Sequence, residues 1–191
     1  MYDMINWAKD LFPINRSLTG EGVRDTLKYL HGINSEIQQH SFETGEQVFD
    51  WEIPREWRIT EAWIEHIETG ERYAVYRSCN LHVIGYSNPI DEKMDRSDLL
   101  PHIYTQPDQP NLIPYVTSYY QDRWGFCMAH NQKESLPEGT YHAYIDSALF
   151  EGELILGDAL IQGQTDQEIM FSSYICHPSM ANNELSGPVL L

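Results

Sequence analysis

The chain has 191 residues, of which 41% are hydrophobic and 12% aromatic, enough to bury the core of one or two globular domains. Its formal net charge is −17, and no Lys or Arg follows Lys133. Phosphate backbones and anionic lipid surfaces are bound by clustered cations, so this balance argues strongly against a nucleic-acid-binding module and against docking on a membrane.

The opening residues and the cysteines bear on the cellular compartment. Residues 1–10 lack the basic region and apolar core of a signal peptide, and no segment approaches the roughly 20 apolar residues that span a bilayer. The three cysteines are widely spaced and odd in number, which fits reduced thiols better than a disulfide framework or a four-cysteine zinc site. These features favour the cytoplasm.

Two helices are predicted near the amino terminus. Residues 2–12 place apolar side chains at helical spacing until Pro13 stops the pattern. Residues 16–24 begin as a turn and enter a second helix near Thr19 or Gly20, which ends near Gly32. The glycines at this entry lack the preceding strand and the Lys of a phosphate-binding loop, so a plain helix start is favoured.

The middle of the chain alternates apolar and polar residues, as strands do. Residues 37–42 read as a strand, and short β-type runs follow at 59–67, 72–76, 81–86, 115–120 and 125–129. A helical beginning and a strand–loop–helix end bracket these runs. The pattern predicts an α/β core formed by residues 1–45 and 136–191, interrupted by a β-rich subdomain over 46–135.

The aromatic residues and histidines of the predicted insert admit two interpretations. Its tryptophans and tyrosines could stack on a ligand, but an aromatic core with cross-strand pairs is favoured. Its histidines lack the tight spacing of metal ligands, which favours core or surface roles. The segment His130–Gln132 could face a cleft, and the sequence leaves that possibility open.

The last third of the chain returns to longer β segments. Residues 140–147 and 153–162 are predicted to form a hairpin that leads through a turn into 168–176, an apolar run typical of a strand buried in a parallel sheet. His177 ends that run, and turn and cap residues then begin a helix. Because ligands bind at the carboxyl ends of strands in open α/β sheets, His177 is the leading candidate site residue.

Three segments carry a resemblance to a known family: Arg16–Gly22, Trp124–Gln132 with Ser135–Gly139, and Tyr174–Gly187. They resemble a bacterial family of uncharacterised aminopeptidase-like proteins related to the di-zinc aminopeptidases, and the similarity runs along essentially the whole chain. It implies a zinc-exopeptidase-like three-layer core, incomplete in this chain, with an inserted β-rich subdomain. Further core and a winged-helix domain would follow Leu191.

The resemblance also implies a metal site. His177 matches a strand-end histidine that ligates zinc, and Ala181–Gly187 matches a segment whose aspartate bridges two metals. Both aspartate positions hold asparagine here, Asn182 and Asn183, and an amide is a weaker metal donor than a carboxylate. Glu184 could substitute if the loop shifts by one residue, although a carboxylate near a helix start also stabilises the helix dipole.

Two functions remain open for the complete protein. One is a metal-dependent, aminopeptidase-like hydrolase that cleaves a peptide or small amide through a zinc-activated water. The other is a catalytically silent peptide- or partner-binding module. A catalytic zinc needs three protein ligands and a base, so this chain alone should be inactive and bind zinc weakly or not at all. An incomplete sheet also predicts a homo-oligomer.

Overall fold

The computed structural model describes residues 3–191, which fold as a mixed α/β chain in two compact units. The first unit comprises Met1–Glu56 and Phe150–Leu191, and the second is Trp57–Leu149. These limits differ from the predicted ones at residues 46 and 136. The difference arises because strand β9 (Thr140–Phe150), assigned to the core from sequence, hydrogen-bonds into the sheet of the second unit.

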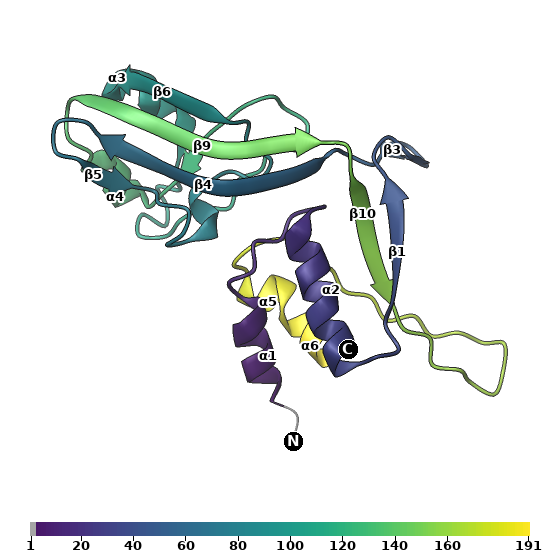
Figure 1. Cartoon of the computed structure of the whole chain (residues 1–191). Helices are drawn as coiled ribbons and strands as arrows, with labels where there is room; N and C mark the ends of the chain where they lie inside the picture. Colours follow the sequence, from purple (N-terminus) through teal and green to yellow (C-terminus); the bar gives the residue numbers. More distant parts are fainter. Residues whose placement is uncertain (1–2) are drawn as a thin grey trace. The chain divides into compact units, whose positions relative to one another are not determined.

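The first unit confirms both predicted amino-terminal helices, apart from Tyr2, which lies outside the described residues (Figure 1). Its elements, in chain order, are α1 (Met4–Leu11), α2 (Glu21–Ile33), β1 (Gln38–Glu43), the short pair β2 (Gln47–Val48) and β3 (Trp51–Glu52), β10 (Glu153–Asp158), α5 (Ala181–Glu184) and α6 (Ser186–Leu190). Strands β1 and β10 form an antiparallel ladder in which Gln38 faces Asp158 and Glu43 faces Glu153.

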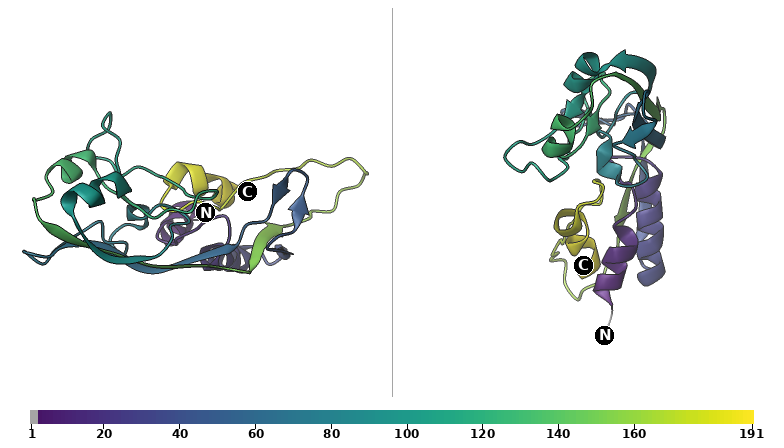
Figure 2. Two further views of the ribbon diagram at one scale, coloured as in Figure 1. Left: turned by 90° about the horizontal axis from the view of Figure 1, so that it is seen from above. Right: turned by 90° about the vertical axis from the view of Figure 1, so that its left-hand side faces the viewer.

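The helices at the two ends of the chain share one small core. Helix α1 lies against α6, as the views of Figure 2 also show. The buried residues between them are Leu11, Leu185 and Val189, with Trp7 and Tyr29 among the half-buried residues packed around them. This packing fixes the carboxyl-terminal residues to the start of the chain.

A partly buried ion pair links α2 to Glu56, which in turn contacts β10. Arg24 donates from both terminal nitrogens to the two carboxylate oxygens of Glu56, each at 2.7 Å. The backbone N–H of Glu153 donates to the same carboxylate, and Gly152 packs so closely that a Cβ would lie 2.4 Å from it. The hydrogen bonds from Arg24 lower the pKa of Glu56.

Two predictions for the last third of the chain are wrong. Strands β9 and β10 are not a hairpin, because β9 pairs with β4 (Glu56–His66) and β6 (Ile90–Asp95) whereas β10 pairs with β1. Residues 168–176 belong to none of the four sheets formed by residues 3–191, and Ile169, Met170 and Phe171 are 84%, 86% and 76% exposed. The segment has the composition of a buried strand, but no strand of residues 3–191 hydrogen-bonds with it.

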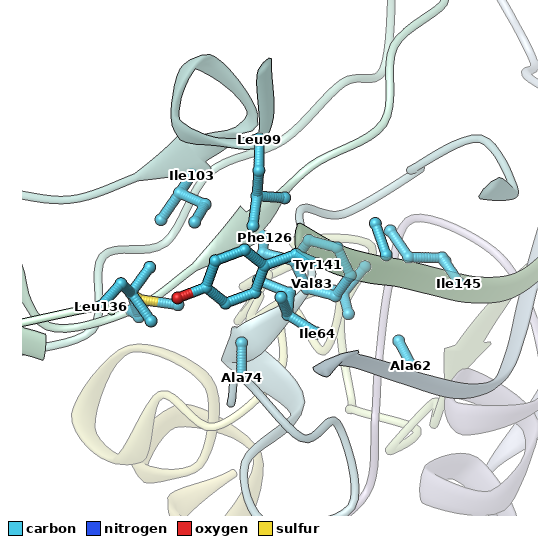
Figure 3. Close-up of a cluster of buried hydrophobic side chains, with 12 residues drawn as sticks. Ala62, Ile64, Ala74, Val83, Leu99, Ile103, Phe126, Leu136, Tyr141 and Ile145 are labelled. Carbon is cyan, nitrogen blue, oxygen red and sulfur yellow. The ribbon is translucent and has the colours of Figure 1, made fainter. Parts of the chain in front are cut away.

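The second unit is built on a four-stranded sheet of order β5–β4–β9–β6, whose neighbours β4 and β9 run in opposite directions (Figure 1). Its other strands are β4 (Glu56–His66), β5 (Glu71–Tyr73) and β6 (Ile90–Asp95). The short elements α3 (Arg96–Leu99), η2 (Leu100–His102), β7 (Ile103–Tyr104), β8 (Phe126–Cys127) and α4 (His130–Glu134) follow β6 in the chain. Figure 3 shows the core, where side chains from β4 and β9 such as Ile64, Tyr141 and Ile145 meet Leu99 and Phe126.

Sequence patterns located the inner strands of this sheet better than the edges. The runs 59–67 and 140–147 correspond to β4 and β9, which alternate buried and less buried residues. The runs 81–86 and 115–120 form a 3-10 turn, η1 (Asn80–His82), and isolated bridges instead of strands. Strand β6 escaped prediction because an edge strand with mostly exposed, charged residues carries little hydrophobic signal.

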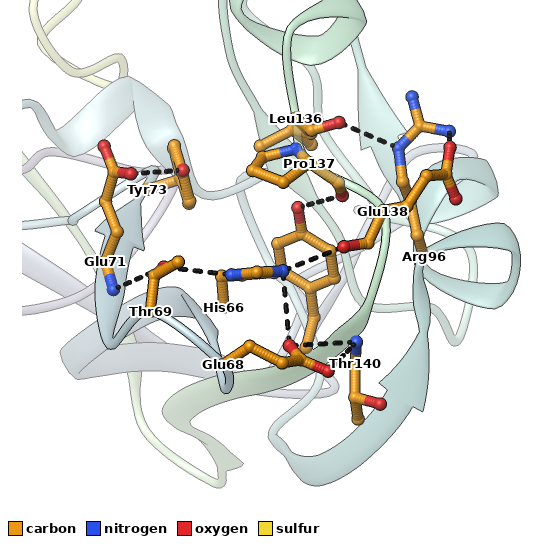
Figure 4. Close-up of polar contacts among 11 residues, drawn as sticks. His66, Glu68, Thr69, Glu71, Tyr73, Arg96, Leu136, Pro137, Glu138 and Thr140 are labelled. Atoms are coloured by element: carbon orange, nitrogen blue, oxygen red, sulfur yellow. Dashed lines mark hydrogen bonds and ion pairs between the residues drawn. The ribbon is translucent and has the colours of Figure 1, made fainter.

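A buried histidine joins two loops at the end of this sheet (Figure 4). His66 is 3% exposed, with its Nδ1 2.9 Å from the hydroxyl of Thr69 and its Nε2 3.1 Å from the carbonyl oxygen of Glu138. The carboxylate of Glu68 lies 3.2 Å from the same Nε2 and accepts from the backbone N–H of Thr140. These contacts give His66 a structural role in the core.

Gly139 allows this network to close, and replacing it tests the arrangement. Its φ is +140°, and a Cβ would lie 2.6 Å from Nε2 of His66, so Gly139→Ala should lower the free energy of unfolding by about 1–3 kcal/mol. The control Gly32→Ala, in a helix with nothing within 4 Å, should raise it by up to about 1 kcal/mol. Urea denaturation measures both, and equal effects would contradict the arrangement.

The ion pair between Arg24 and Glu56 predicts a dependence of stability on pH. Because the folded pKa of Glu56 lies below its ordinary 4.5, its stabilisation is present above that value and is lost as pH falls through the folded pKa. Arg24→Met should cost about 3 kcal/mol at pH 7 and progressively less in acid. Arg77→Met breaks an exposed pair and should cost under about 1 kcal/mol. Chemical denaturation across pH compares them.

Candidate functional site

The candidate site lies where the extended segment ends and α5 begins. Cys176 and His177 precede Pro178, and Ser179 turns the chain with a φ of +47°. Glu184 is the last residue of α5 and is fully buried. The turn brings one sulfur, one nitrogen and one oxygen donor, from Cys176, His177 and Glu184, within 4.8 Å of one another.

The carboxylate of Glu184 holds His177 at two points. One oxygen accepts the backbone N–H of His177 at 2.9 Å, and the other lies 2.5 Å from the ring Nδ1. The ring of His177 therefore has a fixed orientation relative to α5. A metal bound by His177 with this pair intact would be bound through Nε2.

Cys176 adds a soft donor next to the imidazole. Its sulfur lies 3.3 Å from Nδ1 of His177. Burial, followed by the charge of Glu184, raises the pKa of the thiol to about 11. The thiol is therefore protonated at neutral pH, which argues against a thiolate nucleophile paired with His177. As a metal ligand it would release its proton on binding.

The two asparagines predicted near the metal lie on the exposed first part of α5. Asn183 accepts a hydrogen bond from the hydroxyl of Tyr174 at 2.7 Å and donates to the sulfur of Met180 at 3.5 Å. The backbone carbonyl of Asn182 accepts from the hydroxyl of Ser186. Of the four residues predicted from sequence, the structure thus groups His177 with Glu184 and shows the side chain of Asn183 bonded elsewhere.

Sequence reasoning missed two residues of this region, Cys176 and Arg16. Cys176 was noted only as a reduced thiol, although its place beside the strand-end histidine was a usable signal. Arg16 is 1% exposed and donates from Nη1 to the carbonyl oxygen of Leu11 at 2.7 Å. Burial lowers the pKa of Arg16, while the charge of Glu184 acts in the opposite direction. Nothing in local spacing links Arg16 to residues so far along the chain.

The donor set has the chemistry of a zinc site. Thiolate, imidazole and carboxylate are all zinc ligands, and three protein ligands leave the fourth position of a catalytic site open. Two donors on one tetrahedral zinc lie about 3.3 Å apart, farther than Nδ1 of His177 is from Glu184. Binding by all three donors through Nδ1 would thus open that hydrogen bond, whereas binding through Nε2 would keep it.

Known proteins resemble the chain over nearly its whole length. A protein of Clostridium acetobutylicum named "Putative polysaccharide biosynthesis protein with aminopeptidase-like domain" is 39% identical over 189 residues, which are 99% of this chain and 43% of that protein. A crystal structure of a putative peptidase from Clostridium acetobutylicum matches 98% of this chain and 44% of its own, with 39% identity and a TM-score of 0.94.

The chain therefore spans less than half the length of either relative. The names of both agree with the aminopeptidase-like resemblance carried by the three sequence segments. The model of the family described as "Domain of unknown function (DUF4910)" matches residues 5–191, so the chain belongs to that family.

Proposed function

We propose that this chain is part of a metal-dependent peptidase of the aminopeptidase type, in which His177 contributes a zinc ligand. The peptidase-like names of the two relatives support the reaction class. The substrate would be a peptide or a small amide. The zinc-exopeptidase-like three-layer core belongs to the same proposal, and residues that this chain does not include would complete it.

The observation that carries the proposal is the pair formed by His177 and Glu184. Histidines that ligate metals ordinarily donate their other ring N–H to a carboxylate or a carbonyl, which fixes the tautomer and the ring orientation. Glu184 is fully buried and contacts both Nδ1 and the backbone N–H of His177. A surface histidine needs no such support.

The residues of this chain would have distinct tasks. His177 binds the metal, Glu184 orients the imidazole, and Cys176 offers a further donor at the same point. Zinc, when bound, lowers the pKa of its water so that a hydroxide is present at neutral pH. The general base and the remaining ligands would come from the region that the longer relatives have and this chain lacks.

One observation favours the second candidate function, a silent peptide- or partner-binding module. Asn183 stands where the resemblance places an aspartate, and its amide oxygen accepts the hydroxyl of Tyr174 at 2.7 Å. An amide engaged in this way is a poor bridging ligand between two metals. The module would keep the turn and the His177–Glu184 pair without metal chemistry.

Zinc binding to the chain separates the two functions. Because Cys176 offers a second donor beside His177, whose ring Glu184 would orient, we expect measurable zinc affinity, and His177→Ala should reduce it more than about tenfold. Competition with a chromophoric chelator measures the affinity. His142→Ala is the matched control, since His142 also pairs with a carboxylate, that of Asp91 at 2.6 Å, in the other unit.

Two further variants define how His177 would bind. Glu184→Gln should weaken zinc binding roughly 10–100-fold if Glu184 orients the ring. Cys176→Ser should weaken zinc binding as strongly as Glu184→Gln only if the sulfur of Cys176 is a direct ligand. An affinity that is the same in His177→Ala and in the unmodified chain would rule out the metal role and leave the binding module.

A further inference from the structure

Arg16 has the least satisfied buried side chain in the part of the chain that the structure describes. It is 1% exposed, and its Nε and Nη2 are buried without a hydrogen-bond partner. Each unpaired buried donor costs on the order of 1–3 kcal/mol. Arg24 shows the usual solution, because its two terminal nitrogens both reach the carboxylate of Glu56. The burial of Arg16 therefore needs a compensating interaction.

The position of Arg16 points to Glu184. Its Nη1 donates to the carbonyl oxygen of Leu11, and Leu11 packs in one buried cluster with Leu185, the neighbour of Glu184 in the chain. Glu184 is 0% exposed, and a nearby positive charge would stabilise its buried carboxylate. Both carboxylate oxygens already contact His177. Among the described contacts, Arg16 makes no direct hydrogen bond to Glu184, so any effect of Arg16 on this carboxylate would come from its charge.

We propose that Arg16 is a positioning residue of the candidate site that acts through Glu184. Its guanidinium supplies the buried positive charge that keeps the Glu184 carboxylate in place against the Nδ1 and backbone N–H of His177. Arg16 is thereby part of the site, a role that its place before a helix entry does not reveal. The expected effect of Arg16 on metal binding rests on the proposed function. Its expected effect on the contact between Glu184 and Nδ1 of His177 does not.

A purely structural role for Arg16 makes a different prediction. Its bond to the carbonyl of Leu11 satisfies an acceptor at the end of α1, and loss of that bond would lower stability without reference to Glu184. The two roles are separated by asking whether the effect of changing Arg16 depends on the carboxylate. A double-mutant cycle measures this dependence directly.

The experiment follows the ring nitrogens of His177 by ¹⁵N NMR in the metal-free chain. Glu184→Gln defines the shift of Nδ1 that follows loss of the carboxylate. Arg16→Met should move Nδ1 in the same direction, and it should add little in the Glu184→Gln background. Arg24→Met, which removes another arginine from a buried pair of the same unit, should leave Nδ1 unmoved.

Zinc affinity provides the second readout. Arg16→Met should weaken binding about tenfold in the unmodified background and less than about twofold beside Glu184→Gln. Arg16→Lys keeps the charge without the planar guanidinium and should stay within about threefold. Arg16→Gln, which also removes the charge, replaces Arg16→Met if that variant does not fold. Additive effects in the cycle, or an unshifted Nδ1 in the folded variant that removes the charge of Arg16, would overturn the proposal. A chain that binds no zinc but shows the coupled NMR shift would instead refute only the metal function.

Discussion

The buried carboxylate of Glu184 is the constraint on which the carboxyl-terminal part of the structure depends. Removing a carboxylate from water costs several kcal/mol, so it remains charged and buried only with hydrogen bonds and a nearby positive charge. His177 supplies the contacts at Nδ1 and the backbone N–H, and the buried guanidinium of Arg16 is the positive charge that we propose acts on Glu184. The turn at Pro178 and Ser179 and the packing of Leu185 against Leu11 hold these groups together.

The candidate site could be predicted from sequence only where its residues are close in the chain. His177 followed from its place after an apolar run, and Glu184 was considered because it stands one residue from an expected ligand. The sequence placed Glu184 near a helix start, whereas the structure places it at the end of α5 with both carboxylate oxygens in contact with His177. Arg16 escaped prediction because only tertiary packing, such as that of Leu11 with Leu185, brings the start of the chain to the segment that holds Glu184.

The fold shows the same limit. Helical spacing identified α1 and α2, and alternation identified β4 and β9, because each buries one face against a core within its own unit. The charged edge strand β6 gave no such signal, and β9 was assigned to the wrong sheet because alternation does not name a strand's partner. Residues 168–176 were predicted from apolar composition alone, and composition cannot supply the hydrogen-bonding neighbours that a strand requires.

The asparagines of α5 give the site a chemical character of its own. Where the resemblance expects aspartates, Asn182 and Asn183 provide no charge, and they lie exposed on the helix. The carboxylate of the segment stands instead at Glu184, on the buried side, where it faces His177. The one carboxylate of the segment thus contacts an imidazole within the protein. A pair of metal ions would need an anionic bridge, and neither amide supplies one, so the one-metal arrangement of the proposed function is the form of metal site that agrees with this segment.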